Sequence, residues 1–246
     1  MKSAILFLLG MFLTTITGAH AEPDNRCSIT DQAIPILLYH SIAEESGNPL
    51  IMPPDRFQRQ MAYLRDMGYH PLFFGELRDW KKGRLPQKSV IITLDDGYAD
   101  NYAAAFPVLK RTGMKATIFA ITGKIGHTGY LTWEQLRAME LFGFVDTQSH
   151  TVSHPDLTKL NAGEKSRELL RSREAIHRYL GHWPLAFAYP YGKYDDASVQ
   201  AVRFAGYRYA VTGEPGFAQP RQGLLKLHRM LISSEMSMEE FHSLFP

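Results

Sequence analysis

The strongest constraint on the fold of this chain is a regular alternation of short apolar runs with segments of helical periodicity. The predicted strands are IPILLYH, YHPLFF, SVIITL, KATIFAI, FVDTQSH, LAFAYP and YRYAVT, and helical patterns separate most of them. Steady strand–helix alternation predicts a parallel sheet or barrel. With about seven such units in one small domain, we expect a distorted, incomplete (β/α) barrel of seven or eight strands rather than an open sheet.

Two helix starts carry the polar pattern of a capping box. Thr132 is followed by Gln135 three residues later, and Asn161 is followed by Glu164. In such pairs each side chain bonds the backbone N–H of the other residue. The sequence therefore predicts helices over 133–142 and up to Leu180, and the apolar spacing predicts further helices over 75–82, 98–111 and 196–205.

The N-terminus predicts export. Lys2 precedes an apolar run over residues 4–13, and small residues end in Ala19-His20-Ala21. This is the pattern of a secretory signal peptide over 1–21, and the run is too short for a membrane helix. We expect a periplasmic or secreted protein with an extended lead-in over 22–33 and one α/β domain over 34–246.

Composition narrows the range of partners. Cys27 is the sole cysteine, so no disulfide can form within the chain. The net charge of +2 offers no footprint for nucleic acid. We expect a monomer with no membrane span after signal cleavage and no nucleic-acid partner.

Acidic and histidine side chains gather where the predicted strands end. The set comprises His40, Asp95, Asp96, His150, His154 and His228. In (β/α) barrels the chemistry collects at the C-terminal ends of the strands. Solubility alone does not account for such side chains at four separate strand ends.

Two imidazoles and one carboxylate make a three-ligand metal site with an open position for water. His150 and His154 supply the imidazoles, and either Asp95 or Asp96 can supply the carboxylate. The other aspartate is then free to act as a general base on that water. Alone, Asp-Asp-Gly is usually a turn or a helix cap and His-x-x-x-His is a weak signal, so the prediction depends on their co-occurrence.

The motifs TLDDG, SHTVSHPDL and AYPYGKYD, in this order, resemble those of the polysaccharide deacetylases, carbohydrate esterase family 4. The resemblance extends from PILLYHSI to the C-terminus. It implies a distorted (β/α) barrel and metal-dependent hydrolysis of an N- or O-acetyl group on an acetylated glycan, with release of acetate. It also implies Asp95 as general base, Asp96, His150 and His154 as metal ligands, and the Tyr191 N–H as oxyanion donor. Imidazole ligands suit zinc, with cobalt or nickel as alternatives.

The chain departs from the family pattern at two positions. Many members carry an arginine where this chain has Ala188. We therefore expect another group to restrain Asp95 and choose Arg229. The motif PILLYHSI resembles the poly-β-1,6-N-acetylglucosamine deacetylase branch, in which the acid histidine lies near the N-terminus; this implies His40 as the acid, with His228 as the alternative.

Two other functions remain open at the level of sequence. The same scaffold could hydrolyse an amide or imide bond in a small molecule, because no long sugar-binding cleft is defined. The chain could also be an inactive envelope module that binds glycans. The intact set of Asp95, Asp96, His150 and His154 favours an enzyme over the inactive module.

Overall fold

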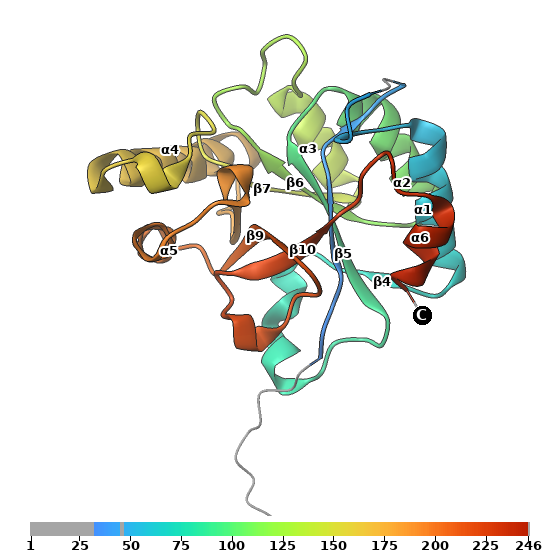
Figure 1. Ribbon diagram of the computed structural model, residues 1–246. Coiled ribbons are helices and arrows are strands. Elements are labelled where there is room, and N and C mark those ends of the chain that lie inside the picture. The colour runs from blue at the N-terminus through green and yellow to red at the C-terminus, as the bar shows by residue number, and fades with distance from the viewer. Residues whose placement is uncertain (1–31, 45–46, 246) are drawn as a thin grey trace, which may run out of the picture.

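The computed structural model describes residues 32–44 and 47–245 (Figure 1). The predicted signal peptide, Cys27 and nearly all of the predicted lead-in lie outside these residues. Within the described part of the chain, no helix combines the length and apolarity needed to cross a membrane.

Eight parallel strands form a ring-like sheet in the order β1-β10-β9-β8-β7-β6-β5-β4. An additional pairing of β1 with β5 closes the ring, and this confirms the predicted fold class. The strands are β1 (Ile36–Tyr39), β4 (His70–Pro71), β5 (Ser89–Asp96), β6 (Ala116–Ala120), β7 (Val145–Ser149), β8 (Ala186–Ala188), β9 (Tyr209–Pro215) and β10 (Leu227–Leu231). A separate parallel pair comprises β2 (Ser41–Ile42) and β3 (Ile51–Met52).

Helices surround this ring (Figure 1). They are α1 (Pro54–Asp66), α2 (Phe106–Thr112), α3 (Trp133–Leu141), α4 (Ala162–Leu180), α5 (Asp196–Phe204) and α6 (Met238–Ser243). In Figure 1, α1, α2 and α6 lie on the right of the ring, and α4 and α5 lie on the left. Both predicted capping boxes are confirmed, because the Thr132 and Asn161 side chains each accept the backbone N–H three residues ahead.

The structure corrects three local predictions. The run YHPLFF forms a strand over His70–Pro71 alone, although the Leu72 N–H still donates to the Val90 carbonyl oxygen of β5. The segment at 75–82 is a 3₁₀ helix, η1 (Phe74–Lys82). The helix predicted over 98–111 starts later, as a π-helical turn, η2 (Asn101–Ala105), and continues as α2.

Successive residues of β5 face two different cores. Ile92 packs in the outer core with residues of α1 and α2, whereas Ile91 packs in the core inside the ring. The inner core also contains Ile36, Phe74, Trp80, Phe119, Val211 and Leu227. Because side chains alternate along a strand, Asp95 shares the inward side of Ile91. Asp96 is the last residue of β5, and its φ of 75° turns the chain away from the extended path.

Candidate metal centre and active site

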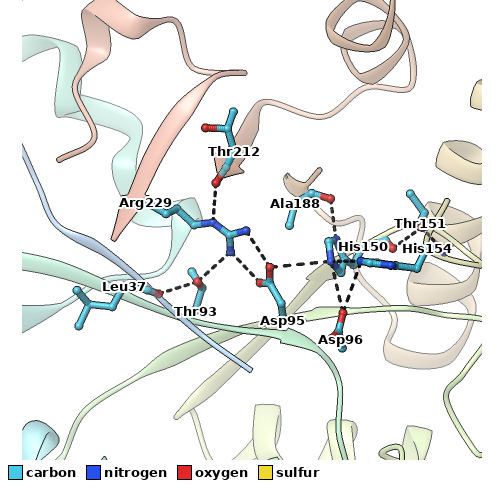
Figure 2. A network of polar contacts seen from close by, with 10 residues as sticks. All are labelled: Leu37, Thr93, Asp95, Asp96, His150, Thr151, His154, Ala188, Thr212 and Arg229. Carbon is cyan, nitrogen blue, oxygen red and sulfur yellow. Dashed lines mark hydrogen bonds and ion pairs between the residues drawn. The ribbon is translucent and has the colours of Figure 1, made fainter. Parts of the chain in front are cut away.

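The side chains of Asp96, His150 and His154 converge at the C-terminal ends of β5 and β7 (Figure 2). Asp96 Oδ1 lies 3.6 Å from His150 Nε2 and 3.7 Å from His154 Nε2, and the two Nε2 atoms are 3.1 Å apart. Tetrahedral zinc with bonds of about 2.0–2.2 Å to nitrogen and oxygen would separate its ligand atoms by roughly 3.3 Å. The triangle therefore has the dimensions and the donor types of a metal site with an open fourth position.

A backbone carbonyl group orients the His150 ring, and burial affects the protonation of the His154 ring. His150 Nδ1 lies 2.7 Å from the carbonyl oxygen of Ala188, to which it can donate only when Nδ1 carries the proton. That tautomer leaves the lone pair of Nε2 facing Asp96, as expected of a metal-ligating histidine. Burial and then the neighbouring His150 lower the pKa of His154 to about 4, so the His154 ring is available in its neutral form near neutral pH.

Strained backbone collects around this centre. Asp96, Thr151, His154 and Tyr191 have φ values of 75°, 68°, 63° and 59°, in the left-handed region that side chains other than glycine rarely adopt. Such conformations cost about 1–3 kcal/mol each and cluster at functional sites. Lys88 is the one other non-glycine residue with positive φ among residues 32–44 and 47–245. The backbone therefore adopts unfavourable conformations at the residues that place these side chains around the centre.

Asp95 is buried inside the ring and paired with Arg229. Arg229 Nη1 donates to Oδ1 and Nη2 donates to Oδ2, both at 2.8 Å. Arg229 is itself held by Nε donation to the Thr212 carbonyl oxygen at 3.1 Å and by Nη1 donation to Thr93 Oγ1 at 3.2 Å. Burial alone would raise the pKa of Asp95, but the guanidinium outweighs it and lowers this pKa to about 2. Asp95 is therefore a carboxylate at neutral pH.

The two carboxylates have different surroundings although they are adjacent in sequence. Asp95 Oδ2 lies 3.9 Å from His150 Nε2, so its carboxylate reaches the edge of the metal triangle from within the ring. Asp96 Oδ1 lies between the two histidines (Figure 2). A group bound at the open position of the triangle can thus lie within hydrogen-bond reach of Asp95.

His40 lies beside this centre, directly after β1. Burial lowers the pKa of His40, and Asp95, Asp96, Arg229 and His150 all act on it electrostatically. Its Nδ1 is buried and has no hydrogen-bond partner within the described residues. Most buried polar atoms in proteins have a hydrogen-bond partner, so this unsatisfied ring nitrogen marks His40 as a candidate functional residue.

Two residues that sequence reasoning missed hold the segment of His40 in place. Asp100 accepts the Ser41 hydroxyl at 2.6 Å and the Ile42 N–H at 2.9 Å. Asn101 Nδ2 donates to the carbonyl oxygen of His40 at 2.9 Å. Both residues belong to the DDGYADN run, so their positions five and six residues past the first aspartate were the available signal.

His228 is placed differently from its prediction. It is the second residue of β10 rather than the residue that ends a strand, and its neighbours Leu227 and Arg229 are buried in the ring. Alternation along the strand turns His228 outward, where its Nε2 lies 2.9 Å from Glu214 Oε2. Glu214 also accepts the Tyr194 hydroxyl at 2.5 Å.

Four further side chains support the centre and were not predicted. Glu168 on α4 accepts the backbone N–H groups of Val152 and Ser153, at 2.8 and 2.9 Å, in the loop between the two histidines. Ser149 and Ser172 share a hydrogen bond of 2.7 Å between β7 and α4. The hydroxyl of Tyr98 bonds Asp96, and burial followed by the charge of Asp96 raises the pKa of Tyr98.

Tyr191 lies at the turn after β8, in contact with the metal triangle. Its ring meets that of His154 edge to face, with centroids 4.6 Å apart, and its side chain is largely exposed. The next residue, Gly192, lies so close to Gly213 of β9 that a Cβ on Gly192 would fall 2.4 Å from Gly213 N and Cα. This close backbone contact sets the position of the Tyr191 turn.

Comparison with known proteins identifies relatives over most of the chain. The model of the polysaccharide deacetylase family matches residues 82–210. A Bacillus subtilis protein named "Putative polysaccharide deacetylase YxkH" is 40% identical over 210 residues, which cover 85% of this chain and 74% of the relative. A poly-β-1,6-N-acetyl-D-glucosamine N-deacetylase of Staphylococcus epidermidis is 33% identical, over 95% of this chain and 91% of the relative.

Solved structures show the same architecture. The Streptococcus pyogenes deacetylase PplD, solved in complex with acetate, superposes with a TM-score of 0.84 at 34% sequence identity. The superposition covers 88% of this chain and all of that structure. The sequence motifs, the closed parallel ring and these relatives agree on one family.

Proposed function

The chain belongs to the polysaccharide deacetylase family, and on that premise we propose that it is a metal-dependent N-deacetylase of a poly-N-acetylglucosamine glycan. Deacetylase chemistry on a glycan follows from the family. The N-acetyl specificity is supported by the relative named as a poly-β-1,6-N-acetyl-D-glucosamine N-deacetylase, which this chain matches over 91% of that relative's length. The observation that carries metal dependence is the Asp96–His150–His154 triangle, with edges of 3.1 to 3.7 Å.

The donor set of this triangle favours zinc, with cobalt and nickel as alternatives, because two imidazoles and a carboxylate suit these ions. A divalent ion held there supplies Lewis acidity, which lowers the pKa of a water molecule and polarises the acetyl carbonyl group. The Ala188 carbonyl and the Tyr98 hydroxyl hold the ligands His150 and Asp96 from outside. Such outer contacts commonly contribute about 10- to 100-fold in metal affinity.

In the proposed reaction, Asp95 accepts the proton of the attacking water. Arg229 binds both oxygens of Asp95, which keeps the base ionised and fixes the plane of its carboxylate. The Tyr191 backbone N–H donates to the oxygen on which negative charge develops. The strained turn at Tyr191 and its contact with the His154 ring support this role.

We assign the general acid to His40, which would protonate the departing amine of the sugar. His40 is half-buried beside Asp95 and Asp96, and its buried Nδ1 has no partner within the described chain. His228 instead faces away from the ring and pairs with Glu214. This difference favours His40 over His228 as the acid.

We further propose that the reaction takes place outside the cytoplasm, in the periplasm or the medium. The basic, apolar and small-residue pattern over 1–21 supports export. An acetylated surface or matrix glycan would be accessible there.

The test is acetate release from N-acetylglucosamine oligomers by purified protein, with O-acetylated xylan and small cyclic imides as comparison substrates. We expect release from the N-acetyl oligomers that stops after chelation and returns with zinc, cobalt or nickel. Asp96→Asn should lose both bound metal and activity, whereas Asp95→Asn should lose activity while it keeps the metal. Turnover of the imides alone would support a small-molecule hydrolase, and metal binding without turnover of any substrate would support a binding module.

A further inference from the structure

A second group of metal-ligand side chains lies at the opposite end of β7. Glu140 is in the last turn of α3, Asp146 is the second residue of β7, and His182 directly follows the glycine that ends α4. One ligand atom from each residue lies within 4.8 Å of the other two. Because β strands rise about 3.3 Å per residue, Asp146 and His150 are separated by roughly 13 Å along the chain. The group is thus distinct from the active centre.

The group lies where β7 and β8 run next to each other but are mostly not paired, a region called the seam below. These strands share one paired position, Ser149 with Phe187, whereas β6 and β7 pair over five positions. Side chains replace the missing ladder: Glu140 Oε1 accepts the Thr147 N–H at 2.9 Å. Gln148 Oε1 accepts the N–H groups of Leu185 and Ala186 at 2.7 and 2.6 Å. Polar side chains therefore join α3, β7 and the start of β8 in this region.

Negative charge exceeds positive charge in this seam. The group has two carboxylates and one imidazole. His182 Nε2 lies 3.1 Å from Glu140 Oε1, and the Asp146 carboxylate accepts a hydrogen bond from the neutral Gln148 amide at 2.9 Å. Burial raises the pKa of Asp146 to about 6; His182 opposes this shift, and the charges of Glu140 and nearby Glu76 add to it. A half-buried carboxylate in such surroundings is stabilised by a proton or by a cation.

We propose that Glu140, Asp146 and His182 bind a second divalent transition-metal ion, of the zinc type, that fastens α3, β7 and the start of β8 together. One imidazole nitrogen and two carboxylate oxygens are ligands that zinc uses, and the 3.1 Å separation of His182 and Glu140 is close to the roughly 3.3 Å edge of a tetrahedral site. The His182 side chain is 35% exposed, so an ion can enter from solvent and keep a water as its fourth ligand.

The ion would act on stability rather than on the reaction. It would neutralise the two carboxylates and cross-link segments that the sheet leaves unpaired. Any ligand that binds the folded state alone stabilises it by mass action. This inference does not depend on the proposed reaction, because none of its three ligands contacts the active centre.

The first test counts zinc per chain after equilibrium dialysis of the full-length protein, by elemental analysis. We expect about two ions for the unmodified protein, and about one for His182→Gln, for Glu140→Gln and for the double variant Asp96→Asn/His154→Gln. Combining the double variant with His182→Gln should abolish binding. His177→Gln is the control for adventitious histidine binding, since His177 lies nearby on α4 but stacks on Trp183, and it should leave the count unchanged.

The second test measures thermal stability in a variant whose active-centre ligands are removed while Glu140, Asp146 and His182 are kept. Zinc at about 100 times its Kd should raise the Tm of Asp96→Asn/His154→Gln protein by roughly 5–10 °C, and adding His182→Gln should remove that shift. If the double variant binds no zinc and its Tm does not move, the group is a metal-free ion pair and the proposal is wrong. If His182→Gln lowers the count but the double variant does not, the seam site stands and the metal dependence of the proposed function fails instead.

Discussion

Arg229 and Asp95 form a buried, two-point ion pair across the interior of the ring, with both N···O distances at 2.8 Å. Both side chains are about 2–3% exposed. The two residues lie on β10 and β5, which are not neighbours in the ring but are joined through β1. The position where many family members carry an arginine is Ala188 here, and its backbone oxygen instead holds His150. Arg229 and the carboxylate that it pairs with thus come from different strands.

Replacing Arg229 should destabilise the protein and change its response to pH. Arg229→Gln leaves the buried Asp95 charge unpaired, for which we expect a loss of about 3–5 kcal/mol at neutral pH. In the unmodified protein the pKa of Asp95 falls from its usual 3.8 to about 2, so its contribution is present above about pH 4 and is lost as the pH falls toward 2. In Arg229→Gln burial should raise that pKa, so acidification toward pH 5 should restore part of the lost stability.

Denaturant unfolding at pH 7.5 and pH 5 measures both effects. The double variant Asp95→Asn/Arg229→Gln is the control, because it removes the charge as well as its partner and should be more stable than Arg229→Gln alone. A loss below about 1 kcal/mol for Arg229→Gln, with no gain on acidification, would show that the pair contributes little.

Sequence motifs predicted the capping boxes and which site residues come together. The contacts that hold those site residues in place are long-range, and most of them could not be predicted from the sequence. The capping boxes at Thr132 and Asn161 depend on four consecutive residues, and the sequence alone could place them. The different surroundings of Asp95 and Asp96 follow from strand alternation together with the left-handed backbone at Asp96, and the latter has no local signal. The contact of Glu168 with the histidine loop spans about 15 residues and depends on how α4 packs, which sequence periodicity does not encode.

Alanine substitution of each candidate acid should show whether His40 or His228 donates the proton. We expect His40→Ala to lower kcat by about 10²- to 10⁴-fold, the usual contribution of a positioned general acid, while the protein keeps its bound metal. His228→Ala should change kcat less than about threefold, because it breaks a half-exposed pair with Glu214 whose typical worth is under 1 kcal/mol. Steady-state kinetics with metal analysis of both variants provide the measurement, and the reverse order of effects would reassign the acid.

Glu168 should control metal affinity without touching the metal. Its carboxylate holds two backbone N–H groups and the Ser153 hydroxyl in the loop that joins His150 to His154. Glu168→Gln weakens these charge-assisted bonds, and we expect metal affinity to fall by about 10-fold or more. Glu174→Gln, an exposed change on the same helix, is the matched control and should leave affinity unaltered. Competition with a chelator of known affinity measures the difference, and equal affinities for both variants would contradict the role of Glu168.

The Tyr191 turn should depend on the absence of a side chain at Gly192. Its φ is 67°, and an added Cβ would lie 2.4 Å from the backbone of Gly213. Gly192→Ala must therefore displace the turn from β9, and a displacement of about 1 Å at an oxyanion donor can cost roughly 100-fold in rate. Gly181→Ala is the control, because Gly181 has a φ of 87° but nothing within 4 Å of an added Cβ.

Both alanine variants incur the left-handed backbone penalty of about 1–2 kcal/mol, so the two should lose similar stability from that cause. The further loss of kcat should appear in Gly192→Ala alone, with its metal content unchanged. Thermal unfolding and acetate-release kinetics of the two variants test this expectation. If Gly181→Ala lost as much activity as Gly192→Ala, the effect would come from general destabilisation, and the tight approach of Gly192 to Gly213 would have no special role in placing the Tyr191 amide.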